Sequence, residues 1–159
     1  MRIALLMVLT AVPALALAQT RAPQIKRTNP PTLSKPTGYS QLVEATGGTT
    51  VYVAGQTASD KDGKVVGKGD MKAQAEQVFK NLQAALAAAG AKFTDVVKMT
   101  TYITDMAQAP AVREVRARYF GDVVPASTLV QIVHLAQPDY MLEIEVTAVV
   151  AAHGVAPSR

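Results

Sequence analysis

The stretch DMKAQAEQVFKNLQAALAAAG, residues 70–90, decides the fold. Its apolar side chains recur at helical spacing between Met71 and Leu86, which indicates an amphipathic helix with one face on a core. Asp70 is suited to an N-cap, because its carboxylate can accept a hydrogen bond from a free amide of the first turn. Gly90 supplies the C′ residue that ends such a helix. We therefore expect a helix between Asp70 and Gly90.

The segments on both sides of this helix carry strand and turn signals. Asp95–Ile103 is rich in β-branched residues, and a second helix is expected to begin near Pro110 and to end at Gly121. Further strands are expected at Ser40–Ala45, Thr50–Ala54, Ser127–Leu135 and Met141–Val150, with a hairpin at Gly47-Gly48 and a loop over residues 59–69. The order of two strands, helix, strand, helix and two strands predicts an α+β fold, in which a mixed β-sheet carries both helices on one face.

Two carboxylates share one side of the last predicted strand. Alternation along Met141–Val150 places Leu142 and Ile144 toward the core and Glu143 and Glu145 on the opposite side, about 7 Å apart. Such a pair can perform acid–base chemistry, or it can belong to a solvated strand face or an edge that meets a partner. The residues alone leave both interpretations open.

Other chemical motifs are incomplete. Glycines near Lys64 and Lys68 lack the spacing of a phosphate-binding loop. His134 and His153 lack the paired spacing of metal ligands, and the chain has no cysteine, so we expect no metal site and no disulfide. Ser127 and His134 are seven residues apart in one predicted strand and would face opposite sides, so they do not form a nucleophile–base pair.

The positive charge is concentrated near the N-terminus. The chain of 159 residues has a formal net charge of +4, with 16 basic and 12 acidic residues. Residues 19–43 contain four basic residues and no acid, whereas residues 44–159 contain 11 basic and 12 acidic residues. The expected globular part is therefore almost neutral, and no basic stripe interleaved with aromatic residues supports nucleic-acid binding.

Residues 1–18, MRIALLMVLTAVPALALA, have the pattern of a signal peptide. One arginine precedes an apolar run that ends in Ala-Leu-Ala, which predicts cleavage after Ala18 and export to the periplasm or the medium, with no stable membrane insertion afterwards. An uncleaved anchor is the alternative. A basic arm with several prolines follows at residues 19–36, where we expect an extended, solvated lead-in. The main domain is expected at residues 37–150 and a C-terminal tail at residues 151–159.

Several segments in a fixed order carry a family resemblance: GYSQLVEA, VYVAGQTA, AQAEQVFKNLQAALAAAGA, DVVKMTTYITDM, RYFGDVVPAS and LEIEVTAVV. Together they resemble the RidA family, also called YjgF or L-PSP. The resemblance implies a chorismate-mutase-like fold and a homotrimer with small-molecule clefts between subunits. It also implies hydrolysis of 2-imino or 2-enamino acids to 2-keto acids and ammonia, without a cofactor.

The resemblance also implies roles for six residues. Glu143 matches the glutamate that orders the attacking water. The arginine that binds the substrate carboxylate is replaced by Ser127, although Pro125-Ala126 before it is present. The substrate-binding positions matched by the resemblance are Tyr39, Gly55, Arg113 (an asparagine in the family), Ser127 and Leu129 (a cysteine in the family).

The serine at position 127 changes the expected chemistry. A guanidinium holds a carboxylate through two charge-assisted hydrogen bonds, whereas a serine hydroxyl offers one neutral bond. Deamination of ordinary 2-imino acids should therefore be weak or altered. Three alternatives remain open: Arg113 supplies the guanidinium from another wall, the pocket takes an uncharged imine, or the protein binds a small organic ligand or partner without chemistry. The near-neutral domain without a histidine pair does not support RNA cleavage.

Overall fold

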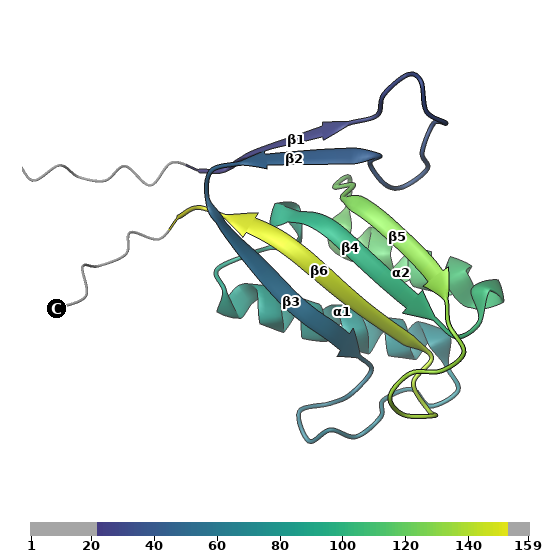
Figure 1. The fold of residues 1–159 in the computed structure, drawn as a ribbon. Helices are drawn as coiled ribbons and strands as arrows, with labels where there is room; N and C mark the ends of the chain where they lie inside the picture. Colours follow the sequence, from purple (N-terminus) through teal and green to yellow (C-terminus); the bar gives the residue numbers. More distant parts are fainter. Residues whose placement is uncertain (1–21, 153–159) are drawn as a thin grey trace, which may run out of the picture.

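Two sheets, two α-helices and two short 3-10 helices (Phe93–Asp95 and Met106–Gln108) are the regular elements of residues 22–152, the part of the chain that the computed structural model describes (Figure 1). The predicted signal peptide lies outside these residues. The strands are β1 (Gln24–Thr28), β2 (Leu42–Thr46), β3 (Thr49–Thr57), β4 (Val96–Ile103), β5 (Ala126–Gln131) and β6 (Leu142–Val150), and the helices are α1 (Met71–Ala88) and α2 (Ala109–Phe120). Neither helix is long and apolar enough to cross a membrane.

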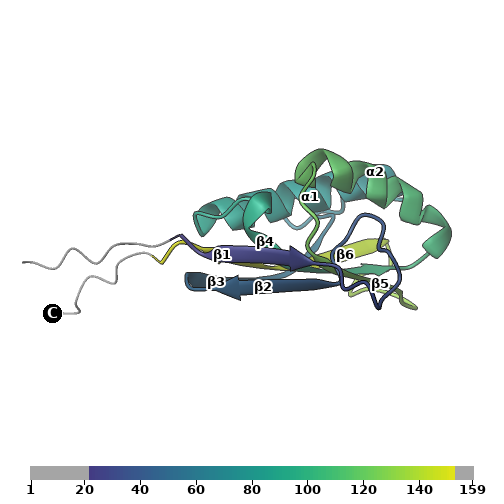
Figure 2. The same ribbon diagram turned by 90° about the horizontal axis from the view of Figure 1, so that it is seen from above.

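The larger sheet is mixed, and both helices lie on one side of it. Its strand order is β3-β6-β4-β5, with β4 and β5 parallel and the other neighbours antiparallel. Figure 2 shows α1 and α2 together above this sheet. The α+β fold predicted from the sequence is therefore confirmed. The opposite face of the sheet is not covered by any described element, and we call it the open face.

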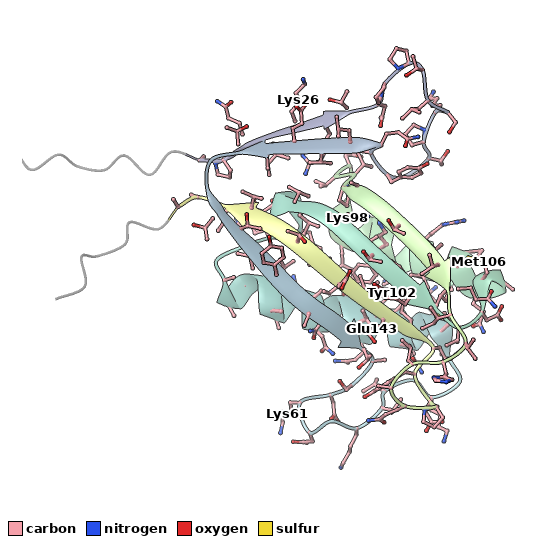
Figure 3. All side chains as sticks on the ribbon, viewed as in Figure 1. Lys26, Lys61, Lys98, Tyr102, Met106 and Glu143 are labelled. Carbon is pink, nitrogen blue, oxygen red and sulfur yellow. The ribbon has the colours of Figure 1, made fainter. Side chains whose placement is uncertain are left out.

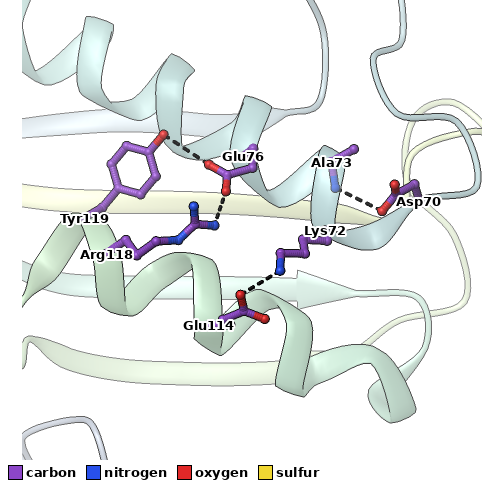
Figure 4. Close-up of polar contacts among 7 residues, drawn as sticks. All are labelled: Asp70, Lys72, Ala73, Glu76, Glu114, Arg118 and Tyr119. Carbon is purple, nitrogen blue, oxygen red and sulfur yellow. Dashed lines mark hydrogen bonds and ion pairs between the residues drawn. The ribbon is translucent and has the colours of Figure 1, made fainter.

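Helix α1 begins and ends where its caps predict. The Asp70 carboxylate accepts a hydrogen bond from the amide of Ala73 at 3.0 Å, and Gly90 has a φ of 69° beyond the last turn. Phe79, Leu82 and other members of the apolar face are fully buried. Figure 4 shows how the polar side of α1 contacts α2 through two ion pairs, Lys72–Glu114 and Glu76–Arg118.

A buried glutamine fixes the start of β6. The amide nitrogen of Gln74 donates to the carbonyl of Asp139 at 2.7 Å, and its amide oxygen accepts from the amide of Met141 at 2.9 Å. Gln74 is completely buried, so these bonds are shielded from water and hold the turn before β6 against α1. The position of Glu143, two residues after Met141, is determined in part by this contact.

The hairpin predicted at Gly47-Gly48 is wrong. The two glycines do connect β2 to β3, but β2 pairs with β1 and β3 pairs with β6. The chain passes directly from one sheet to the other here, and a Cβ on Gly48 would lie 2.4 Å from the carbonyl oxygen of Val150. A residue with a side chain does not fit this close approach.

Part of the basic arm is folded. We predicted a solvated lead-in over residues 19–36, but Gln24–Thr28 is strand β1, antiparallel to β2. Arg27 extends from β1 to the larger sheet, and its Nη2 donates to the carbonyls of Thr94 and Val96 at 3.3 Å each. The predicted strand Ser127–Leu135 is also shorter than expected, because β5 ends at Gln131 and leaves the exposed His134 in the following loop.

Candidate functional site

The carboxylate of Glu143 lies directly against the backbone of Gly55. A Cβ built on Gly55 would be 1.8 Å from Oε1 of Glu143 and 2.6 Å from its Cδ. Gly55 belongs to an irregularity in β3, where the pairing with β6 shifts between Val53 and Gln56. Its φ is not positive, so glycine is needed here for space and not for an unusual backbone conformation. The sequence prediction that these two residues belong to one site is consistent with this contact.

Tyr102 and Glu145 lie next to Glu143 on the open face. Tyr102 on β4 is the cross-strand partner of Glu143 on β6, and Figure 3 shows both on this face. The Tyr102 hydroxyl is 3.5 Å from Oε1 of Glu145. The negative charge of Glu145 is the main cause that raises the pKa of the Tyr102 phenol, with burial, the hydrogen bond and Glu143 adding to it. Tyr102 is therefore a neutral donor beside two carboxylates, and sequence reasoning did not identify it.

A shallow depression continues the open face away from Glu143. Its volume is about 350 Å³. Glu145 and Lys98 are its charged lining residues, and Lys98 Nζ also contacts the hydroxyl of Thr128 on β5. The complete lining is Tyr52, Val53, Ala54, Lys98, Thr100, Glu145, Val146 and Thr147.

Ser127 and Leu129 lie on the other side of the sheet. In the β4–β5 register Ser127 pairs with Met99 and Leu129 pairs with Thr101, and both partners on β4 are buried under the helices. Paired residues of neighbouring strands share a face, and Leu129 packs against the core. Tyr102, by contrast, shares the open face with Glu143. Within one chain, Ser127 and Glu143 are therefore separated by two strand positions and by the sheet itself.

Tyr39 lies near the beginning of β5. The next residue, Ser40, forms an isolated parallel bridge with Ala126, and its hydroxyl donates to the carbonyl of Val124 at 2.6 Å. Arg113 is an exposed residue of α2. The structure thus separates the predicted residues into two groups. Gly55 and Glu143 lie on the open face, and we call them the Glu143 group. Tyr39 and Ser127 lie at the β5 edge, which α2 covers, and we call them the β5 group.

One arginine that sequence reasoning did not single out lies in the second group. Nη1 of Arg116 donates to the carbonyl of Gly38 at 2.6 Å, and the guanidinium carbon is 5.2 Å from the centre of the Phe120 ring. Burial lowers the pKa of Arg116 from its ordinary value. The sequence offered only a weak signal, an arginine four residues before an aromatic residue on a helix.

Metal ligands are not clustered within residues 22–152. No group of three or more histidine, cysteine, aspartate or glutamate side chains is arranged there to hold a metal ion. The carboxylates of the open face instead adjoin a phenol, a glycine backbone and a lysine. This arrangement can accept and donate protons and can orient a water molecule.

A mixed four-stranded sheet with two helices on one face and a glycine-backed carboxylate on the other defines a small α+β domain. The family described as Endoribonuclease L-PSP matches residues 32–150. The chain belongs to this family, which is also known as RidA or YjgF, and the resemblance found in the sequence is confirmed.

Relatives with assigned names cover most of the described chain. A RutC family protein of Pyrococcus horikoshii is 43% identical over 116 residues, which are 72% of this chain and 89% of that protein. A protein of Dermatophagoides farinae named 2-iminobutanoate/2-iminopropanoate deaminase is 33% identical over 121 residues, 76% of this chain and 92% of that protein. A solved Rid-family protein of unknown function from Yersinia pestis is similar with a TM-score of 0.73 at 36% identity, covering 79% of this chain and 98% of that one.

Proposed function

We propose that this protein hydrolyses a small imine or enamine, with Glu143 as the residue that orients and deprotonates the attacking water. The contact between the Glu143 carboxylate and Gly55 carries the proposal, because it places a carboxylate on an uncovered face against a backbone position without a side chain. The names of the mite relative and of a mouse relative, 35% identical over 111 residues, support this class of substrate.

The proposed reaction requires only water and proton transfers. An enamine first takes a proton on carbon and becomes the imine. Glu143 then accepts a proton as the water oxygen bonds to the carbon of the protonated C=N group, whose π electrons move to nitrogen, and this gives a carbinolamine. The nitrogen is then protonated, the C–N bond breaks with its electron pair leaving on nitrogen, and ammonia or an amine departs. Loss of the hydroxyl proton completes the carbonyl product. Tyr102 is the cross-strand partner of Glu143, and its hydroxyl contacts Glu145, so these two residues are candidates to take part in the proton movements.

The two groups of site residues are joined when copies of the chain assemble. Ser127 and Glu143 lie on opposite faces of the sheet, so a ligand that touches both is held between two chains. We propose a homotrimer, in which one chain supplies the Glu143 group and the next supplies the β5 group. The open face also exposes Tyr52, whose relative exposure is 81%, and Val130, at 38%, as expected for a surface that contacts another copy. Light scattering during gel filtration measures the assembly directly.

The substitution at position 127 predicts altered activity on 2-imino acids. The Ser127 hydroxyl cannot hold a carboxylate as a guanidinium does, and the exposed Arg113 has no described contact that directs it to the site. We therefore expect the wild type to turn over 2-iminobutanoate slowly or in an altered way. The test compares the rates of the wild type and Ser127→Arg on this substrate. Activity gained in Ser127→Arg shows that the rest of the site is competent.

The test of the function is the replacement of the carboxylate. Glu143→Gln should abolish release of ammonia from freshly generated imines above the spontaneous rate. Glu44→Gln on β2 is the matched control, since it removes an equally charged group from an exposed ion pair with Lys26. Equal activity of the two variants would overturn the proposal. Absence of turnover in both the wild type and Ser127→Arg would favour the alternative, a protein that binds a small molecule without chemistry.

We also propose that the protein is exported, on the strength of residues 1–18. The support is the order of one arginine, an apolar run and a terminal Ala-Leu-Ala. Mass spectrometry of protein from the periplasm or the medium should find Gln19 as the first residue. Protein found only in the cytoplasm with Met1 or Arg2 at its terminus would contradict export.

A further inference from the structure

The guanidinium of Arg116 lacks a counterion among the described residues. Arg116 takes part in none of the ion pairs that link residues 22–152, and its Nε and Nη2 are covered by protein without a hydrogen-bond partner there. Its neighbour Arg118 on the same helix, in contrast, pairs with Glu76. A partly buried charge without an anion is unfavourable, and the planar guanidinium of an arginine is suited to a carboxylate.

Arg116 lies close to the residues of the β5 group. Arg116 belongs to the last two turns of α2, which leads directly into β5, where Ser127 is the second residue. Its Nη1 donates to Gly38, the residue before Tyr39, and Ser40 after it bridges to Ala126. The guanidinium is therefore attached to the same short segment that lies beside the beginning of β5.

We propose that Arg116 binds the carboxylate of the substrate, and so takes over the role of the arginine that is absent at position 127. In the unliganded chain the carbonyl oxygen of Gly38 occupies one donor of Nη1, and the ligand carboxylate exchanges with this neutral acceptor. Gly38 is exposed and lies in a bend, so the release of Nη1 requires movement of a surface segment. The inference rests on the proposed function and specifies its substrate class as carboxylate-bearing.

The exchange is favourable because the two acceptors differ in charge. Hydrogen bonds between a guanidinium and a carboxylate are charge-assisted and are made in pairs, whereas a backbone carbonyl is neutral and accepts from Nη1 alone. The lowered pKa of Arg116 reflects the same unbalanced burial. Arg113, one turn earlier on α2, is exposed and has no comparable contact among residues 22–152. The structure therefore favours Arg116 over the arginine that the sequence suggested.

Binding of a product-like pair tests the inference without requiring turnover. The probes are 2-oxobutanoate and 2-oxobutanamide, which differ in charge but hardly in shape, measured by calorimetry on the full chain. Arg116→Gln should weaken 2-oxobutanoate binding by about tenfold to a hundredfold and change 2-oxobutanamide binding less than threefold, as expected for loss of a charged hydrogen-bonded pair. Arg118→Gln, which removes the same charge from the same helix, is the control and should leave both affinities unchanged.

Two kinds of outcome would decide against the inference. Equal weakening of both probes, or no weakening of the charged one, would show that Arg116 does not recognise the carboxylate. If Arg116→Gln dissociates the assembly but leaves the affinity per chain unchanged, the counterion of Arg116 is a carboxylate of a neighbouring chain and not the ligand. If Arg116→Gln loses its cooperative melting transition, Arg116→Lys is measured in its place, because lysine keeps the charge but cannot make the paired hydrogen bonds of a guanidinium. Binding of 2-oxobutanoate should again weaken more than binding of 2-oxobutanamide. Selective binding of 2-oxobutanoate by a chain that hydrolyses no imine would retain this inference while removing the proposed function.

Discussion

The contact between Gly55 and Glu143 can be tested by adding a single methyl group. In Gly55→Ala the new Cβ would lie 1.8 Å from Oε1 of Glu143, and Cβ atoms essentially never approach other atoms closer than 3.0 Å. The carboxylate oxygen must therefore move by at least about 1.2 Å, the difference between these two distances. Because a displacement of about 1 Å at a reacting group can reduce a rate by about a hundredfold, we expect a loss of that order in kcat/KM.

The same substitution should leave the fold intact. Gly55 has no positive φ, so alanine fits its backbone conformation, and replacing glycine inside a strand restricts the unfolded chain. The free energy of unfolding in urea should therefore change by less than about 1 kcal/mol. Activity is measured as ammonia release from freshly generated imines, above the spontaneous rate.

A matched control separates the effect of the contact with Glu143 from the general effect of adding a methyl group. Gly63→Ala adds the same group where no atom lies within 4 Å, so it should keep full activity, although its φ of 79° makes it somewhat less stable. If Gly55→Ala retains activity within threefold of the wild type, the placement of Glu143 against Gly55 does not serve catalysis, and our reasoning about this contact is wrong.

Three further predictions concern capping and charge. Asp70→Ala should lower the free energy of unfolding by about 1 kcal/mol in urea denaturation, because α1 loses its N-cap. Glu145→Gln should lower the pKa of the Tyr102 phenol toward its ordinary value, which absorbance titration of tyrosinate measures. The hydrogen bond from Lys72 lowers the pKa of Glu114, so the pair stabilises the fold above the ordinary glutamate pKa and loses this effect as the pH falls. NMR titration of Lys72→Met should show the Glu114 pKa returned upward; an unchanged value would contradict this assignment.

The helices and the last strand could be predicted because their signals are local. Helix α1 carries its spacing, its N-cap and its terminal glycine within residues 70–90, and β6 alternates visibly between core and open face. The pairing of β2 could not be predicted in the same way, since a glycine pair signals a turn but does not select the partner of the strand before it. That partner, β1, lies in a segment whose basic residues and prolines resemble a linker.

The residues of the candidate site also differ in whether their signals are local in the sequence. Glu143 was found through the alternation of the last strand and received its role from the resemblance, which also supplied Gly55. Arg116 was missed because its meaning depends on Gly38, which is 78 residues away along the chain and carries no side chain to signal the contact. Tyr102 was missed because a tyrosine in a strand is ordinary until the register places it opposite Glu143.

The separation of the two groups by the sheet has a genetic consequence. If each site is built from the open face of one chain and the β5 edge of the next, a substitution in one group can be complemented by a chain that carries a substitution in the other. A chain with Glu143→Gln still offers an intact β5 edge, and a chain with Arg116→Gln still offers an intact carboxylate. In trimers assembled at random from equal amounts of these two impaired proteins, about one interface in four would combine an intact carboxylate with an intact arginine. Two alleles that are each impaired would then restore part of the activity when both are expressed in one cell.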